Sequence, residues 1–268
     1  MPRLEVENDR AIYYEHLAGS RRPVLNIHAW AMSLRVWDTL AYPLRDRDHT
    51  VVSFDQRCCG KSDKDFAVSS IDASASDTMA LVEALGLEGV VVNGWSLGGA
   101  VAAEVAHRLG SRCAGLILTC AASPRYTQAD GFPHGATPAD VAGTVAAIRP
   151  NRAEFFHNIA GIVCARPVGE PTLSWMRSIF WESSPGADLP LGELAHIDQR
   201  DLIAGLDVPV LAVVGSDDAF TPPGIGETAA ALAKEGTLVR FEGCGHAPLI
   251  EETDAYISAV TAFLDRIG

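Results

Sequence analysis

The feature that most constrains the fold of this chain is a serine in a tight turn between a predicted strand and a predicted helix. Residues 90–93 form a valine-rich run typical of a buried strand, and in residues 97–109 Ala, Val and Leu recur at helical spacing. Gly94-Trp95-Ser96-Leu97-Gly98 joins the two and fits the pattern G-x-S-x-G. Small residues at both ends of such a turn let helix and strand pack closely while the serine hydroxyl projects. Ser96 is therefore the predicted nucleophile.

The order of the other elements predicts an α/β protein with a mostly parallel central sheet flanked by helices. Strand, turn and helix signals alternate along the chain, and no internal repeat is present. A chain of 268 residues is long enough to bury a core of this kind. The predicted strands cover residues 23–27, 50–54, 90–93, 116–119, 208–214 and 237–241, and the clearest helices cover residues 74–85, 97–109 and 254–267.

Residues 123–200 break this alternation. The segment is rich in proline, contains helical patterns at 138–148 and 173–181, and offers Trp175, Phe180 and Trp181 for burial. A segment this long between two parallel strands favours a helical cap (lid) over the site, inserted after the sixth strand. An insertion with no role in the site is the alternative. The predicted α/β core then consists of residues 1–122 and 201–268.

A serine hydroxyl needs a base that accepts its proton, and His246 is the predicted base. It stands in Gly243-Cys244-Gly245-His246-Ala247-Pro248, between the last predicted strand and the last helix. The flanking glycines allow the ring to reach across the end of the sheet. A lone histidine elsewhere is most often a surface residue, so no role is assigned to His16, His49, His107, His134, His157 and His196.

An acid is expected to orient the imidazole, and it is predicted in the loop after residues 208–214. This loop supplies two neighbouring carboxylates, Asp217 and Asp218. Asp218, the third residue after Gly215, is the predicted partner of the histidine, but Asp217 stays open as an alternative that otherwise caps the turn or is solvated. The end of strand 116–119 continues as Cys120-Ala121-Ala122 and offers no acid.

Acyl transfer also needs N–H donors for the developing oxyanion. One is predicted at the backbone of Leu97, where the helix begins. The second is assigned to the backbone of Trp30, in the loop His28-Ala29-Trp30-Ala31. Trp30 and Trp95 are the predicted substrate-binding residues, with plain core packing as the alternative for the Trp30 side chain.

Charge and composition exclude several classes of partner. A formal net charge of -13 argues against nucleic acid, and the longest apolar run, residues 114–122, is about half of what a bilayer span requires. Residues 1–8 are charged and contain no cleavable leader, so we expect a cytoplasmic protein without a membrane partner. The six cysteines form no C-x-x-C pair and are expected to be free thiols. No histidine stands at ligand spacing from another His or Cys, so neither a metal nor a cofactor is predicted.

Over nearly its whole length the chain resembles α/β-hydrolase-fold serine esterases. His28-Ala29-Trp30 is similar to their His-Gly-x oxyanion loop, and residues 55–62 resemble their D-x-R-G-x-G-x-S turn. Residues 94–99 and His246-Ala247-Pro248 look most like the pimeloyl-carrier-protein methyl ester esterase group. Residues 151–156 are similar to cofactor-free haloperoxidases, which share the triad.

Three departures from the family pattern limit what the resemblance implies. Ala29 replaces the usual glycine, which places a Cβ beside the oxyanion, and Cys58 replaces another glycine in a structural turn. The cap also lacks the basic surface with which carrier-protein esterases bind their acidic partner. It mixes both signs of charge, so a carrier-protein partner stays open but unsupported: Arg149, Arg152, Arg166 and Arg177 stand among Asp140, Glu154, Glu170 and Glu182.

The resemblance implies a carboxylic ester hydrolase for small to medium acyl esters, acting through Ser96, His246, Asp218 and an acyl-enzyme. Perhydrolysis or haloperoxidation, and lactone or thioester hydrolysis, are alternatives on the same triad. A non-catalytic ligand receptor is a third reading, against which the complete triad counts. Epoxide hydrolases and haloalkane dehalogenases use an aspartate where Ser96 stands, and the His-Gly-Gly-Pro-Gly loop of prolyl iminopeptidases is missing.

Overall fold

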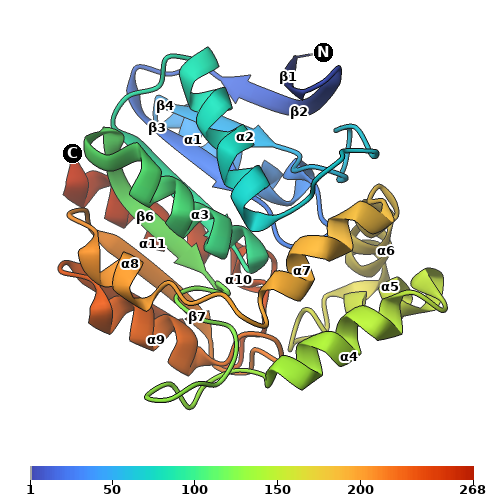
Figure 1. Ribbon diagram of the computed structural model, residues 1–268. Coiled ribbons are helices and arrows are strands. Elements are labelled where there is room, and N and C mark those ends of the chain that lie inside the picture. Colours follow the sequence, from blue (N-terminus) through green and yellow to red (C-terminus); the bar gives the residue numbers. More distant parts are fainter. Residues whose placement is uncertain (1) are drawn as a thin grey trace.

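The computed structural model describes residues 2–268, which form one eight-stranded sheet between two layers of helices (Figure 1). The strand order is β1-β2-β4-β3-β5-β6-β7-β8. The two strands β1 and β2 pair in antiparallel fashion with their neighbours, and all pairs from β4 to β8 are parallel. The strands are β1 Arg3–Glu7, β2 Arg10–Leu17, β3 Arg21–Ile27, β4 His49–Phe54, β5 Val90–Trp95, β6 Cys113–Thr119, β7 Val210–Gly215 and β8 Gly236–Phe241.

This architecture confirms the predicted fold class, and the six predicted strands correspond to β3 through β8. The strands β1 and β2 were not predicted. Most of their residues are exposed or half-buried, because the two strands lie at the edge of the sheet. A strand that faces solvent lacks the continuous apolar run by which buried parallel strands are recognised.

The helices cover the two faces of the sheet unequally (Figure 1). One face carries α1 and α11, which contact each other, and the other carries α2, α3, α8 and α9. None of the helices in the described part of the chain combines the length and apolar character needed to cross a bilayer. The bounds are α1 Asp38–Asp46, α2 Ile71–Ala84, α3 Leu97–Leu109, α8 Arg200–Gly205, α9 Pro223–Leu232, α10 Pro248–Glu251 and α11 Thr253–Ile267.

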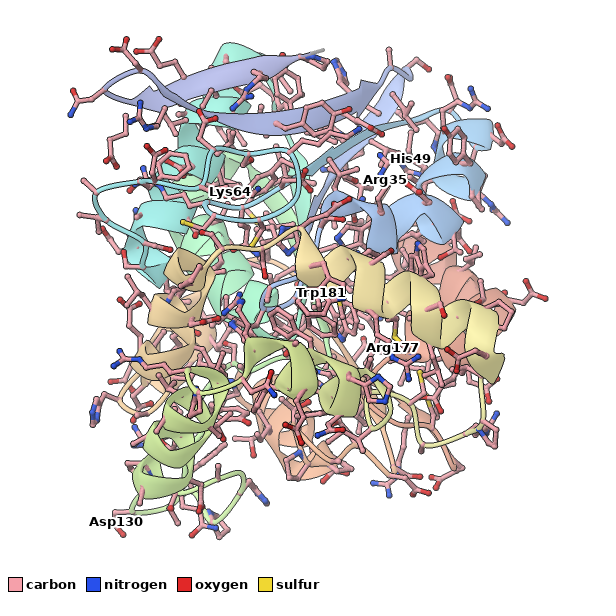
Figure 2. The ribbon with its side chains drawn as sticks, turned by 90° about the vertical axis from the view of Figure 1, so that its right-hand side faces the viewer. Arg35, His49, Lys64, Asp130, Arg177 and Trp181 are labelled. Atoms are coloured by element: carbon pink, nitrogen blue, oxygen red, sulfur yellow. The ribbon has the colours of Figure 1, made fainter. Side chains whose placement is uncertain are left out.

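Four helices between β6 and β7 lie beside the end of the sheet where the parallel strands terminate, and we call them the cap (Figure 1). They are α4 Pro138–Ile148, α5 Arg152–Ala160, α6 Gly169–Trp181 and α7 Leu189–Glu193. Figure 2 faces the cap, with Arg177 and Trp181 labelled. Phe180 is buried as expected, whereas Trp181 is 55% exposed, so its predicted burial is wrong.

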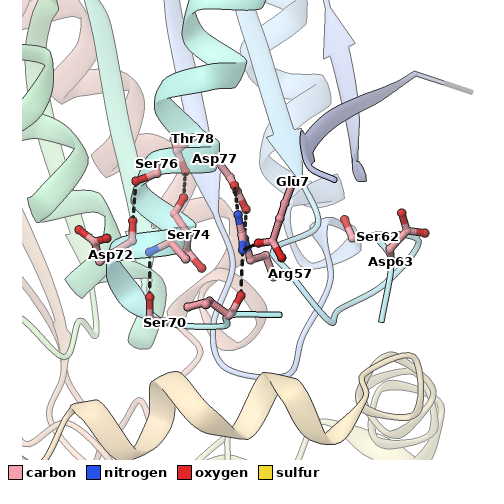
Figure 3. A network of polar contacts seen from close by, with 12 residues as sticks. Glu7, Arg57, Ser62, Asp63, Ser70, Asp72, Ser74, Ser76, Asp77 and Thr78 are labelled. Carbon is pink, nitrogen blue, oxygen red and sulfur yellow. Dashed lines mark hydrogen bonds and ion pairs between the residues drawn. The ribbon is translucent and has the colours of Figure 1, made fainter. Parts of the chain in front are cut away.

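A buried arginine anchors the turn after β4 (Figure 3). The Arg57 guanidinium donates two hydrogen bonds to the Asp77 carboxylate, at 2.6 and 2.7 Å, and one to the Val68 carbonyl at 2.8 Å. It also pairs with Glu7 on β1. Because a bidentate pair fixes direction as well as distance, this network joins the turn to α2 and to the edge of the sheet.

The same turn contacts the cap through Cys58, which stands where the family pattern has glycine. Cys58 has a left-handed backbone, with φ of +67°, so the missing glycine imposes strain here. Its carbonyl accepts a hydrogen bond from the Ser184 N–H at 2.8 Å. A Cβ at Gly186 would lie 2.5 Å from the Cys58 Sγ, so the cap approaches the turn as closely as a glycine permits.

Candidate active site

Ser96 lies between β5 and α3 in a strained backbone conformation, with φ of +57° and ψ of -122°. Its N–H donates to the Thr119 carbonyl at 3.0 Å, and its own carbonyl accepts from Gly99 and Ala122, each at 2.9 Å. A non-glycine residue keeps such angles only when its surroundings fix them, and residues of this kind are common at functional sites. The turn therefore holds Ser96 at the end of the sheet.

Two glycines make this turn possible. A Cβ on Gly94 would lie 2.3 Å from the Gly98 carbonyl oxygen. One on Gly98 would lie 2.4 Å from the carbonyl oxygens of both Ile27 and His28. These distances are too short for any side chain, so the close packing of strand, turn and helix depends on glycine at both positions.

The structure brings His246 and Asp218 together. His246 Nδ1 lies 2.8 Å from Asp218 Oδ2, and both side chains are buried. Asp217 is exposed, and its carboxylate accepts a hydrogen bond from the Ser216 hydroxyl at 2.7 Å. Of the two aspartates that the sequence left open, Asp218 is thus the one that contacts the imidazole.

Three further donors surround the Asp218 carboxylate. It accepts hydrogen bonds from the backbone N–H groups of Phe220 and Thr221, at 2.8 and 2.9 Å, and from the Thr221 hydroxyl at 2.6 Å. Burial alone would raise the pKa of Asp218, but the His246 imidazole and these hydrogen bonds outweigh it and lower the pKa below its ordinary value. An ionised Asp218 accepts the Nδ1 proton, which leaves His246 Nε2 as a proton acceptor.

The backbone of His246 is fixed by two contacts from distant parts of the chain. The Trp95 indole N–H donates to the His246 carbonyl at 2.7 Å, and the His246 N–H donates to the Val163 carbonyl at 2.9 Å. Trp95 is fully buried, so besides lining the cavity it positions the histidine loop, a role that sequence reasoning missed. Within residues 2–268 no hydrogen bond joins the Ser96 and His246 side chains, and both residues line one cavity.

The two predicted oxyanion donors belong to residues close to Ser96 in the cavity wall. Leu97 is the first residue of α3, and both Leu97 and Trp30 line the same cavity as Ser96. The left-handed residue in the Trp30 loop is Ala31, with φ of +52°, and not Ala29. Replacement of the family's glycine at position 29 therefore introduces a Cβ that faces the cavity without left-handed backbone strain at that residue.

His28 was only part of a resemblance in the sequence, and the structure shows what it contacts. Its Nδ1 lies 2.7 Å from the Ala29 carbonyl, and its Nε2 accepts the Gln56 N–H at 2.9 Å. The Gln56 side chain returns a hydrogen bond of 2.7 Å to the His28 carbonyl. Burial lowers the pKa of His28 to about 4, so the ring is neutral and fits one donor and one acceptor. His28 and Gln56 thereby position the Trp30 loop.

Comparison with known proteins shows the family of this chain. The family model for the alpha/beta hydrolase fold matches residues 22–159. The chain belongs to the alpha/beta hydrolase family. It is 28% identical over 274 residues to a non-heme haloperoxidase of Rhodococcus erythropolis, covering 99% of this chain and 100% of that protein. It is 27% identical to a pimeloyl-[acyl-carrier protein] methyl ester esterase of Neisseria meningitidis, with 92% and 94% covered.

Solved structures also share the fold of this chain. An esterase from Exiguobacterium antarcticum superposes with a TM-score of 0.91 at 26% identity, and the match covers 96% of each chain. These similarities confirm the resemblance to α/β-hydrolase esterases and haloperoxidases that the motifs predicted.

The cap of this hydrolase closes over a cavity of about 770 Å³ that reaches both Ser96 and His246. Apolar side chains of the cap dominate its upper wall: Phe155, Ile159, Ile162, Phe180, Leu191 and Leu194. The Trp30 ring also lines the cavity and packs against Phe155 and Phe180, with ring centroids 6.0 Å away in each case. Trp30 thus both lines the cavity and packs in the core, and its role in substrate binding stays a prediction.

One cluster in residues 2–268 has the composition of a metal site. Ligand atoms of Cys120, Asp218 and His246 lie within 4.8 Å of one another, and all three residues are buried. Burial, and next the charge of Asp218, raise the pKa of Cys120 well above its ordinary value, so its thiol is protonated. A cysteine binds a metal ion as a thiolate, and Cys120 is protonated. A cation would also compete for the carboxylate that His246 already contacts. The donor set fits the histidine–aspartate pair better than an ion.

Proposed function

We propose that this hydrolase cleaves carboxylic esters with small to medium acyl groups, using Ser96 as nucleophile. One observation carries the proposal: Ser96, in its strained turn, opens into the same cavity as a histidine whose Nδ1 lies 2.8 Å from a buried, ionised aspartate. This is the arrangement that a weakly nucleophilic hydroxyl requires, a base on one side and an acid that orients the base.

In the proposed mechanism the Ser96 Oγ attacks the ester carbonyl carbon while His246 Nε2 takes the hydroxyl proton. Asp218 stabilises the imidazolium, and the N–H groups of Leu97 and Trp30 donate to the oxyanion. The carbon–oxygen bond to the alcohol then breaks, and His246 returns the proton to the leaving oxygen. Water attacks the acyl-enzyme with His246 again as base, which releases the acid and restores Ser96.

The decisive experiment is hydrolysis of p-nitrophenyl butyrate by Ser96→Ala. If the triad acts as a unit, kcat should fall by about 10⁶-fold. The matched control is Ser178→Ala, because Ser178 is an exposed serine on α6 whose hydroxyl donates only to the Trp175 carbonyl within its own helix. An unchanged rate in Ser96→Ala would contradict the proposal.

A second activity is supported by the end-to-end similarity to a non-heme haloperoxidase. In this reading hydrogen peroxide replaces water on the Ser96 acyl-enzyme and a peracid is released. Measuring peracid formation from acetate and peroxide beside ester hydrolysis separates the two activities. Lactones and thioesters need the same groups and belong in the same substrate panel. We propose a small-molecule ester as the partner and the cytoplasm as the location; both rest on the sequence.

A further inference from the structure

The wall of the cavity carries a carboxylate but no lysine or arginine among the residues that the structure describes. The carboxylate is that of Asp140, near the start of α4. Hydrogen bonds from the Thr137 hydroxyl, at 2.7 Å, and from the Thr137 N–H, at 2.8 Å, lower the pKa of Asp140. Asp140 is exposed, and among the described residues it is the only charged residue of the cap that lines the cavity.

Two arginines of the cap have protein partners outside the cavity wall. Arg152 pairs with Asp188, donates to the Ser183 hydroxyl at 2.8 Å, and lies over the Phe156 ring, 4.4 Å from its centroid. Arg177 pairs with Glu170 at 2.6 Å. Their guanidinium groups are thus held by protein partners and do not line the cavity.

The remaining polar groups of the cap wall are neutral. Thr144 uses its hydroxyl to donate to the Asp140 carbonyl at 2.9 Å, and Asn158 contributes an amide. The apolar wall of Phe155, Ile159 and their neighbours completes the surface. Moving a carboxylate from water into such surroundings is costly unless a cation or several donors compensate it.

We propose that the substrates are esters whose acyl group is apolar and uncharged, and that the cavity rejects monoesters of dicarboxylic acids. This inference rests on the ester hydrolysis proposed above and adds the substrate class. The absence of a cation from the cavity wall carries it, and the anionic Asp140 adds to the discrimination at low salt.

The test compares p-nitrophenyl heptanoate with p-nitrophenyl hydrogen adipate, in which a carboxylate takes the place of the terminal ethyl group of the heptanoyl chain. The kcat/KM of the wild type should be on the order of 100-fold higher for heptanoate, after correction for the rates of the two esters with hydroxide. A ratio near one would overturn the inference.

A charge placed on the cavity wall should reverse part of this preference. Asn158→Arg adds a cation on the cavity side of α5, and should raise kcat/KM for adipate by about tenfold with little change for heptanoate. His157→Arg is the matched control, because His157 is the exposed neighbour on the same helix and does not line the cavity. Equal effects of the two variants on the ratio would contradict the assignment.

The outcomes also separate this inference from the proposed function. If both esters are cleaved equally well, and Ser96→Ala abolishes both rates, ester hydrolysis stands and only the charge selectivity falls. If the wild type cleaves neither ester, the proposed function falls and the inference falls with it.

Discussion

The floor and the roof of the cavity are held in place by different forces. The floor comprises Trp30, Ser96, Leu97 and His246, and the roof is the cap wall above them. Floor residues are fixed by hydrogen bonds: His246 Nδ1 donates to the Asp218 carboxylate, and the Trp95 indole N–H donates to the His246 carbonyl. Roof residues are fixed by packing: the Phe156 and Phe180 rings stack with centroids 5.0 Å apart.

This difference follows from what each half has to do. A nucleophile, a base and an oxyanion site must keep their relative positions to within a fraction of an ångström, and directional bonds achieve this. An apolar wall requires only side chains of suitable size and apolar character, and several residue types meet both requirements. We therefore expect changes in the floor to affect the chemical step strongly and changes in the roof to affect selectivity modestly.

The largest effect is expected in the floor, at the base. His246→Ala removes the proton acceptor for Ser96 and should lower kcat on p-nitrophenyl butyrate by about 10⁶-fold. His196 is exposed and lies outside the cavity, so His196→Ala should leave kcat unchanged. A His246→Ala enzyme that kept most of its kcat would remove the distinction between floor and roof.

The next effect concerns the acid. Asp218→Asn replaces the acceptor opposite His246 Nδ1 with an amide that favours the wrong tautomer, so kcat should fall by about 10⁴-fold. The neighbouring Asp217 is exposed, and Asp217→Asn should retain nearly full kcat. Comparable losses in the two variants would show that the buried pair does not orient the base.

The hydrogen bonds of the floor should also appear in the pH dependence of stability. Burial holds the pKa of His28 at about 4 in the folded chain, below the 6.5 of a free imidazole. The unfolded chain therefore binds more protons in this window, so stability is complete above about pH 6.5 and falls as the pH decreases toward 4. Between about pH 7.5 and pH 5 the loss from His28 should be about 2 kcal/mol.

Urea unfolding of the wild type and His28→Asn at these two pH values measures that contribution. Asp55 changes the free energy of unfolding in the opposite direction as the pH falls, because burial raises its pKa to about 6. This contribution is the same in the wild type and in His28→Asn. The wild type should lose about 2 kcal/mol more than the variant on going to the lower pH. An identical pH dependence in both would mean that His28 is not held neutral by burial.

The smallest effect is expected in the roof. Ile159→Ala shortens a side chain that lines the cavity and should lower kcat/KM for p-nitrophenyl octanoate by about tenfold, with p-nitrophenyl acetate changed less than about twofold. Ile257→Ala is the control, because Ile257 is a half-buried isoleucine on α11 outside the cavity. A matching loss on acetate would place Ile159 among the residues that support the chemical step.

Much of the fold could be predicted because buried strands and helices leave local patterns in the chain. The strands β3 to β7 each have a buried apolar run, α3 and α11 have helical spacing, and the exposed edge strand β8 was predicted from its short Leu238-Val239 pair. Elements that depend on contacts between residues far apart in the sequence were not predicted. The edge strands β1 and β2 are half-exposed, and α5 and α7 depend on contacts within the cap.

The sequence by itself determined the strand, the tight glycine-flanked turn and the helix around Ser96, because these elements leave local patterns in the chain. The roles of Ser96 as nucleophile and His246 as base stay predictions from that pattern. The tertiary structure decided what contacts what. It brought Asp218, and not Asp217, into contact with the His246 imidazole, the Trp95 indole into contact with the His246 carbonyl, and the Gln56 N–H into contact with His28. The reason is physical: hydrogen-bond partners separated by tens of residues meet only when the sheet aligns the ends of its strands.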